Sequence, residues 1–301
     1  MKFVSLFSGA GGFDLGFEKS GMECVLQVEQ DKYALDVLNR HWPDVPKMED
    51  VRDVTAKVTG GVELIVGGFP CQDCSIANGR NRKGLDGERS GLWYEFRRIL
   101  EEARPEWCVI ENVPGLLTSN GGRDFAIVLQ GLEELRYGTA WRTLDSQHFG
   151  VPQRRRRLFI VGHLGDGRAA EVLFERESLC RDTAKSRQER TPTARETEEC
   201  FNPASPQVVF TYSMNWQSGQ GGLNPQEEKT DALIANQTVA VYSPLSDGGV
   251  RRLTPTECCR LQGFPDNHND WLSDAQRYKQ MGNAVTVNVA QWIGRRIKET
   301  E

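Results

Sequence analysis

Short apolar runs alternate with amphipathic segments through the first half of the chain. Four runs are rich in apolar residues and too short for buried helices: 2–7, 24–28, 64–66 and 107–110. Segments with apolar residues three or four positions apart follow them, at 13–17, 32–39, 92–103 and 125–135. This alternation predicts an α/β fold with a Rossmann-like sheet.

The pattern becomes less regular after residue 135. A strand is predicted at 140–144, and the apolar arms at 148–151 and 158–162 predict a hairpin. Residues 166–204 are polar and charged, and 205–250 hold only short β-like pieces between Gly, Asn and Ser. We therefore expect a second, smaller, β-rich domain.

Two helices are predicted in the last part of the chain. Thr254 is suited to cap the first, and Pro255 to occupy its first turn. The second is an apolar helix at 287–297, which the segment 280–285 leads into.

Charge and composition add limits to this picture. The formal net charge of the 301 residues is -5, yet basic residues cluster after position 79 and at Arg154, Arg155, Arg156 and Arg157, which predicts a basic cleft on an acidic body. Eight cysteines are too few for a disulfide scaffold, and neither a signal peptide nor an apolar run of about 18 residues is present. We expect a cytoplasmic protein without a membrane segment.

The glycine turn, residues 8–12, follows the first predicted strand and precedes a helix. Such a turn lets backbone N–H groups approach a ligand, and Glu29 at the end of the next strand suits ribose hydroxyls. The dinucleotide fingerprint G-x-G-x-x-G fails because Asp14 stands at its third glycine. An adenosine ligand without pyrophosphate is therefore favoured over NAD.

Cys71 follows a buried strand and Pro70, in the stretch GGFPCQDCS at 67–75. A thiol at the carboxyl end of a strand is a candidate nucleophile, although cysteine is also a common core residue. Cys74 could make a redox pair or half a zinc site with it, but no second C-x-x-C occurs, so we expect no metal. The glycine-rich segment 78–91 predicts a lid or binding loop.

Eight stretches together resemble the C5-cytosine DNA methyltransferases. They run in the family's order from residue 3 to about 293, and only 163–250 lies outside the match. The eight stretches are LFSGAGGFDLGF, Glu29, EDV at 49–51, GGFPCQDCS, ENVPGLL at 111–117, QRRRRLFIVG at 153–162, RRLTPTECCRLQGFPD at 251–266 and QMGNAVTVNVA at 280–290. The resemblance implies the S-adenosylmethionine-dependent methyltransferase sheet. It also implies a catalytic domain at 1–165 completed by 281–301, a target recognition domain at 166–253 and a hinge at 254–280.

The same resemblance assigns roles to single residues. Cys71 matches the nucleophile that attacks cytosine C6, and Glu111 the acid that binds N3 and the N4 amine, although a helix cap is the plainer reading of Glu111. Arg155 and Arg157 match the arginines that hold the base's O2 and orient the site. Other residues match positions that hold the methyl donor S-adenosylmethionine: Phe7, Gly9, Gly11, Gly12, Glu29, Asp50, Val51, Pro70, Asn283 and Val285.

The implied partner is double-stranded DNA, with the target cytosine flipped out of the helix. The residues expected to touch DNA are Gln72, Ser75, Arg89, Arg251 and Arg252. We expect a monomer, with a cognate restriction endonuclease acting separately where one exists. Three alternatives stay open: a tRNA cytosine methyltransferase on the same scaffold, an inactive DNA-binding relative, and a nicotinamide oxidoreductase.

Overall fold

The computed structural model describes residues 1–70, 92–174, 210–213, 224–227, 230–231, 240–242 and 250–301. All structural statements below concern these residues.

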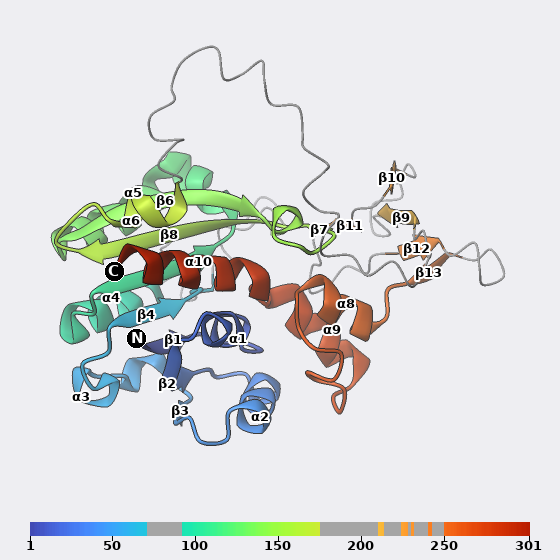
Figure 1. Ribbon diagram of the computed structural model, residues 1–301, viewed down its shortest axis with the longest axis horizontal. Coiled ribbons are helices and arrows are strands. Elements are labelled where there is room, and N and C mark those ends of the chain that lie inside the picture. The colour runs from blue at the N-terminus through green and yellow to red at the C-terminus, as the bar shows by residue number, and fades with distance from the viewer. Residues whose placement is uncertain (71–91, 175–209, 214–223, 228–229, 232–239, 243–249) are drawn as a thin grey trace, which may run out of the picture.

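A seven-stranded sheet forms the centre of the molecule (Figure 1). Its strands, in spatial order, are β3 Lys47–Met48, β2 Glu23–Val28, β1 Lys2–Leu6, β4 Leu64–Gly67, β5 Trp107–Asn112, β8 Arg156–Leu164 and β6 Tyr137–Asp145. The first five pair in parallel, whereas β8 runs antiparallel to both of its neighbours. The predicted α/β class with a Rossmann-like sheet is confirmed.

Alternating side chains of the central strands pack against two layers of helices. Val4 and Ile65 belong to the core shared with α4 Leu92–Ala103 and α5 Arg123–Glu134. Phe3 and Leu64 face the other core, shared with α1 Gly12–Lys19, α6 Ala169–Leu173 and α10 Val287–Thr300. Both faces of the central sheet are therefore covered, as parallel strands require.

Helices α1 and α10 approach each other closely through small residues. A Cβ atom on Gly16 would lie 2.5 Å from the Cβ of Ala290, and one on Gly294 would lie 2.5 Å from the hydroxyl of Ser20. In Figure 1, α10 crosses in front of the sheet beside β8. The C-terminal helix is thus part of the sheet's cover.

The predicted hairpin arm at 148–151 is wrong. The segment after β6 is the 3₁₀ turn η5 Ser146–His148, and the antiparallel partner of β8 is β6, with Thr143 opposite Leu158. The apolar residues of 148–151 pack in the core instead of forming a strand: Val151 is buried, and Phe149 contacts Trp292 edge-on. Irregular segments that bury apolar side chains resemble strands in sequence.

The remaining helices and strands lie outside the seven-stranded sheet and the helices that cover it. They are α2 Lys32–His41, η1 Val51–Asp53, α3 Ala56–Thr59, η4 Pro114–Gly122, β7 Gln153–Arg154, β11 Thr230–Asp231, α8 Pro255–Leu261 and α9 Asp274–Asn283. Thr254 caps α8 and Pro255 lies in its first turn, as predicted. Helix α9 was not predicted, because its polar sequence DAQRYKQMGN carries few apolar residues at helical spacing.

A second, four-stranded sheet has the order β10-β9-β12-β13. Its strands are Asn224–Glu227, Phe210–Ser213, Ala240–Tyr242 and Val250–Arg252. Strands were expected in this region, whereas its role as a recognition domain and the bounds 166–253 and 254–280 stay predictions.

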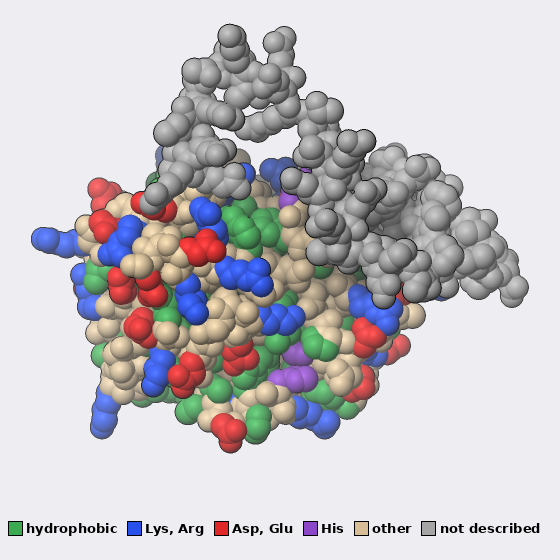
Figure 2. Space-filling model, viewed as in Figure 1, with side chains coloured by type: hydrophobic (Ala, Val, Ile, Leu, Met, Phe, Trp, Pro, Cys, Tyr) green, Lys and Arg blue, Asp and Glu red, His purple; other side chains and the backbone are tan. Residues whose placement is uncertain are grey.

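Acidic and basic side chains are interspersed on the face shown in Figure 2. In the described ranges, no helix is both long and apolar enough to cross a membrane.

Candidate active site

The carboxyl ends of β1, β4 and β5 bring three predicted segments to one edge of the sheet. Leu6 lies beside Gly67, and Gly67 beside Ile110, in the parallel register. The next residues along each strand are therefore neighbours: the glycine turn, the segment leading to Pro70, and Glu111. Ligands of open α/β sheets collect at this edge.

Glu111 is paired with Arg157 across the antiparallel strands β5 and β8. The Nε atom of Arg157 lies 3.1 Å from Oε1 of Glu111, and both side chains are largely buried. Burial raises the pKa of the Glu111 carboxyl, although Arg157 and Arg155 act in the opposite direction. The carboxyl therefore holds a proton more readily than an exposed glutamate.

Gly68, three residues before Cys71, lies against this carboxyl. A Cβ atom at position 68 would lie 2.8 Å from Oε2 of Glu111, so only glycine fits there without displacing the acid. Asn112, the neighbour of Glu111, donates from its side-chain amide to the Phe69 carbonyl at 3.4 Å. Two successive residues of β5 thus contact the segment from Gly68 to Pro70.

Arg155 reaches the C-terminal segment. Its Nη2 group donates to the carbonyls of Gly282 at 2.9 Å and Ala284 at 2.8 Å, and its side chain is 2% exposed. Burial, with Arg157 nearby, lowers the pKa of Arg155 well below its usual value. The two predicted arginines therefore lie together but make different contacts, one with Glu111 and the other with the backbone at the C-terminal end of α9.

The glycine turn is held by Glu29 from the end of β2. Oε2 of Glu29 accepts from the N–H of Gly9 at 2.8 Å, and Oε1 accepts from the N–H groups of Gln30 and Asp31. Burial raises the pKa of the Glu29 carboxyl, while these backbone N–H groups lower it. Gly9 and Gly11 have φ values of +57° and +82°, which favour glycine.

Space around the turn differs from one glycine to the next. A Cβ atom at Gly9 would meet nothing within 4 Å, whereas one at Gly11 would meet the Trp42 ring at 2.5 Å and one at Gly12 the Val285 carbonyl at 2.4 Å. The turn is therefore closed on the sides of Gly11 and Gly12 and open over Gly9. This open side, beside the Glu29 carboxylate, is where a ligand can approach the backbone.

Three other residues predicted to hold the methyl donor differ in conformation and exposure. Phe7 has a φ of +55°, a conformation that costs a non-glycine residue about 1–2 kcal/mol. Asn283 is exposed at the end of α9. Val51 is buried in the core below α4.

Asp50 caps η1. Its carboxylate accepts from the Arg52 N–H and pairs with the Arg52 guanidinium at 2.7 Å, and these hydrogen bonds lower its pKa. Its contact with a methyl donor stays a prediction.

Several predicted residues lie outside the described part of the chain: Cys71, Gln72, Ser75, Arg89 and the loop 78–91. Of the predicted DNA contacts within it, Arg251 forms a two-pronged pair with Glu257, at 2.7 and 2.8 Å, and Arg252 is exposed. No group of three or more His, Cys, Asp or Glu suited to a metal ion occurs among the described residues.

Sequence analysis missed two aromatic residues beside the glycine turn. The buried ring of His268 bonds the Ala10 carbonyl through Nε2 at 2.6 Å, and Trp42 covers Gly11. Neither residue belongs to a periodic pattern, and His268 lies 258 positions from Ala10 in the chain. The fold alone brings them together, so no local signal could have found them.

Curated type II methyltransferases are similar to this chain over nearly its whole length. The chain is 32% identical over 319 residues to the type II methyltransferase M2.BsuMI of Bacillus subtilis (strain 168), covering 99% of this chain and 76% of the relative. It is 28% identical over 316 residues to M.HhaI of Haemophilus parahaemolyticus, covering 97% and 93%.

Solved structures with low sequence identity show the same fold. The methyltransferase EhMeth of Entamoeba histolytica has a TM-score of 0.70 at 17% identity and covers 100% of this chain and 99% of its own. The Dnmt2 methyltransferase of S. pombe has a TM-score of 0.67 at 18% identity and covers 99% of both chains.

A model of the C-5 cytosine-specific DNA methylase family matches residues 1–199 and 171–299, which is nearly the whole chain. With the resemblance in motif order and the identity to type II methyltransferases, this match identifies the chain as a member of the C-5 cytosine-specific DNA methylase family.

Proposed function

We propose that this protein transfers a methyl group from S-adenosylmethionine to C5 of a flipped-out cytosine within a short specific sequence of duplex DNA. The observation that carries the proposal is the buried Glu111 carboxyl, paired with Arg157 and lying against Gly68 at the entrance to the Cys71 segment. Family membership supports the reaction class.

The chemistry follows from the reactivity of cytosine. C5 is a poor nucleophile, so a thiolate first adds to C6 and the ring electrons move to C5, which then attacks the methyl group. A base afterwards removes the C5 proton, and the thiolate leaves as the C5–C6 double bond reforms. We assign the thiolate to Cys71.

Glu111 is suited to assist this addition from the other side of the ring. A carboxyl with a raised pKa can share a proton with N3 and accept from the N4 amine, which draws electrons out of the ring as the thiolate adds. Arg157 holds the carboxyl in place and offers further donors for O2.

The residues at the glycine turn fit the methyl donor. The open side over Gly9 admits an adenosine against the backbone, and the Glu29 carboxylate beside it can accept from ribose hydroxyls. S-adenosylmethionine supplies an electrophilic methyl group on a sulfonium when bound. Asp50, Phe7 and Asn283 are proposed as further contacts, and Arg155 ties the segment bearing Asn283 to the catalytic strands.

The cytosine lies within a stacked duplex, so it must leave the helix to reach Cys71. We assign closure over the flipped base to 78–91 and base reading to residues within 166–253. Arg89, Gln72, Ser75, Arg251 and Arg252 are proposed DNA contacts, of which the arginines would make binding weaken with salt. The protein is proposed to act as a monomer, separately from any cognate endonuclease.

Bisulfite sequencing of DNA from a host that expresses the protein tests activity and target sequence together. We expect one short sequence to be methylated in the wild type and no methylation with Cys71→Ser. The absence of methylated cytosines in the wild type would contradict the proposal, and equal methylation in both would remove Cys71 from the mechanism. Parallel assays with labelled donor on plasmid and on tRNA separate the DNA enzyme from its tRNA alternative.

A further inference from the structure

One peptide plane of the glycine turn is held on both sides by buried partners. The carbonyl of Ala10 accepts from His268 at 2.6 Å, and the N–H of Gly11, in the same plane, donates to the Ser8 carbonyl at 3.0 Å. Because a peptide bond is planar, fixing both groups fixes the orientation of the whole plane. Residues 9, 11 and 12 of the turn are glycines and have no side chains that could hold this plane.

His268 is itself rigidly placed. Its ring stacks on that of His41 at 4.2 Å and contacts that of Phe264 at 4.4 Å, while its backbone carbonyl accepts from the His41 ring at 2.7 Å. Its side chain is 1% exposed, and burial lowers its pKa to about 4. The ring is therefore neutral near pH 7, and the proton lies on Nε2, because a carbonyl can only accept.

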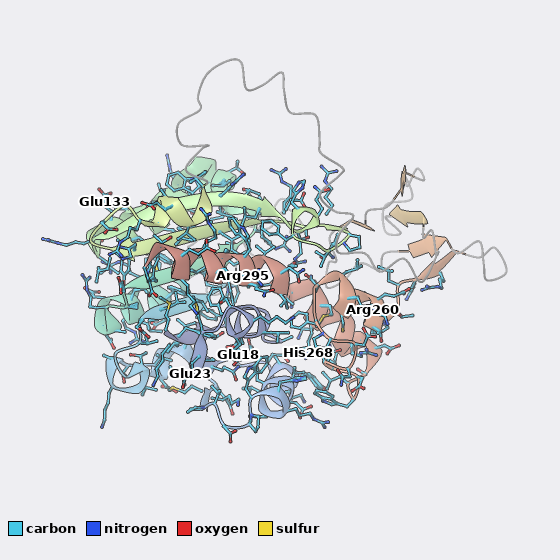
Figure 3. All side chains as sticks on the ribbon, viewed as in Figure 1. Glu18, Glu23, Glu133, Arg260, His268 and Arg295 are labelled. Carbon is cyan, nitrogen blue, oxygen red and sulfur yellow. The ribbon has the colours of Figure 1, made fainter. Side chains whose placement is uncertain are left out.

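The position of His268 links two distant parts of the chain. It comes from the segment between α8 and α9, whereas its partners His41 and Ala10 belong to the N-terminal half of the chain. In Figure 3, His268 is labelled between the N-terminal helices and α9. Trp42, next to His41, covers Gly11. The glycine turn is thus set between Glu29 on one side and an aromatic cluster on the other.

We infer that His268 is a positioning residue for the methyl donor, acting through its hydrogen bond to the Ala10 carbonyl to keep the glycine turn in the shape that binds the donor. This inference rests on the proposed function, because it takes S-adenosylmethionine as the ligand of the turn. Loss of the bond leaves a buried carbonyl unsatisfied and lets the Ala10–Gly11 plane rotate.

The test compares His268→Phe, which keeps an aromatic ring but cannot donate, with His268→Gln, whose amide can. Trp271→Phe is the matched control. The Trp271 indole bonds Asp36 at 2.5 Å and its ring contacts that of His41, so it joins the same two parts of the chain but makes no hydrogen bond to the turn. Affinity for S-adenosylmethionine is measured by calorimetry. A buried hydrogen bond corresponds to a loss of about 10-fold to 100-fold in His268→Phe.

We expect His268→Gln to recover most of that affinity and Trp271→Phe to bind as the wild type does. At saturating donor, the kcat of His268→Phe should stay within a few-fold of wild type while the KM for the donor rises. Wild-type affinity in a folded His268→Phe protein overturns the inference, and so does an equal loss in Trp271→Phe. A wild type that does not bind S-adenosylmethionine contradicts the proposed function instead.

Hydrogen exchange of the wild type gives a second measurement, which stands even where His268→Phe fails to fold. Donor binding should slow exchange in residues 8–14 and in 264–270 together, because the bond joins them. Slowing of the first segment alone overturns the inference.

Discussion

At the scale of single residues, the contacts of Glu111 decide what its carboxyl can do. Arg157 lies 3.1 Å from one oxygen, and Gly68 leaves just enough room for the other. An exposed pair of the same kind occurs elsewhere: Glu134 lies 3.1 Å from Arg97 on the surface. Variants of the two pairs therefore distinguish the effect of a buried acid from that of a surface ion pair, which contributes little to stability in water.

Glu111→Gln is expected to lower the rate of methyl transfer by about 10²-fold to 10⁴-fold, because an amide cannot share a proton with the cytosine ring. Incorporation of labelled methyl groups at saturating DNA and donor measures the effect. Glu134→Gln is the control and should retain the wild-type rate. A Glu111→Gln enzyme as fast as the wild type would remove the acid from the mechanism.

The pKa of His268 predicts a pH dependence of stability. The group titrates near 4 when folded and near 6.5 when unfolded, so the unfolded state takes up more protons between these values. The contribution of neutral His268 to the free energy of unfolding is fully present above pH 6.5 and is lost as the pH falls toward 4. At pH 5 the loss is about 2 kcal/mol.

Urea unfolding of wild type and His268→Gln at pH 7.5 and pH 5 gives the free energy of unfolding of each protein. The loss appears as a change, between the two pH values, in the difference between these free energies. The wild type should lose more stability than the variant on acidification. His148→Gln, at an exposed site, is the control and should show a smaller change. A difference between wild type and His268→Gln that is the same at both pH values would show that His268 takes up its proton equally in both states.

At the scale of elements, α8 begins with a complete capping box. Thr254 accepts from the N–H of Glu257 at 3.2 Å, and Glu257 accepts from the N–H of Thr254 at 2.7 Å. Arg251 pairs with Glu257 as well, and that hydrogen bond is the main cause that lowers the pKa of Glu257 to about 2. The start of α8 is thereby fixed next to β13.

Thr254→Ala is expected to lower the free energy of unfolding by about 1 kcal/mol, because the N–H of Glu257 loses the Thr254 hydroxyl as its acceptor. Thr55 precedes α3 in the same position but makes no side-chain cap hydrogen bond, so Thr55→Ala is the matched control. Chemical denaturation of both variants gives the comparison. Equal losses would mean that the box adds nothing to α8.

The elements also show how far sequence patterns reach. Helix α4 was predicted with its exact bounds, because its apolar spacing is regular, and the cap of α8 was predicted from Thr254 and Pro255. Helix α9 was missed because its burial depends on polar residues, Arg277 and Gln280, held by Asn269. The edge carrying Glu111 follows from parallel strand ends, whereas the His268 contact depends on tertiary packing.

At the scale of the whole molecule, the first and last helices of the described chain are packing partners. Gly16 of α1 lies so close to α10 that an added Cβ would be 2.5 Å from Ala290 and 2.7 Å from the Val287 carbonyl. Apolar residues of both helices share one core with the sheet. The N-terminal half of the chain is therefore complete only with its C-terminal end.

Gly16→Ala should lower the free energy of unfolding by about 1–3 kcal/mol through overpacking. Helix propensity alone predicts the opposite sign, a gain of about 1 kcal/mol. Gly167→Ala, where a Cβ would meet nothing within 4 Å, is the control and should be near neutral. Thermal unfolding compares the three proteins, and a stabilised Gly16→Ala would show that α1 and α10 can move apart without cost.

This pairing has a consequence for synthesis on the ribosome. Helix α1 leaves the exit tunnel long before α10 is translated, and at about 5–20 residues per second the delay is on the order of ten seconds to a minute. During that time the nascent chain exposes Phe13 and Phe17 without the apolar cover that α10 later provides. Chaperones that recognise exposed aromatic segments have this interval in which to bind it, and the core shared by α1 and α10 forms only after α10 has been translated.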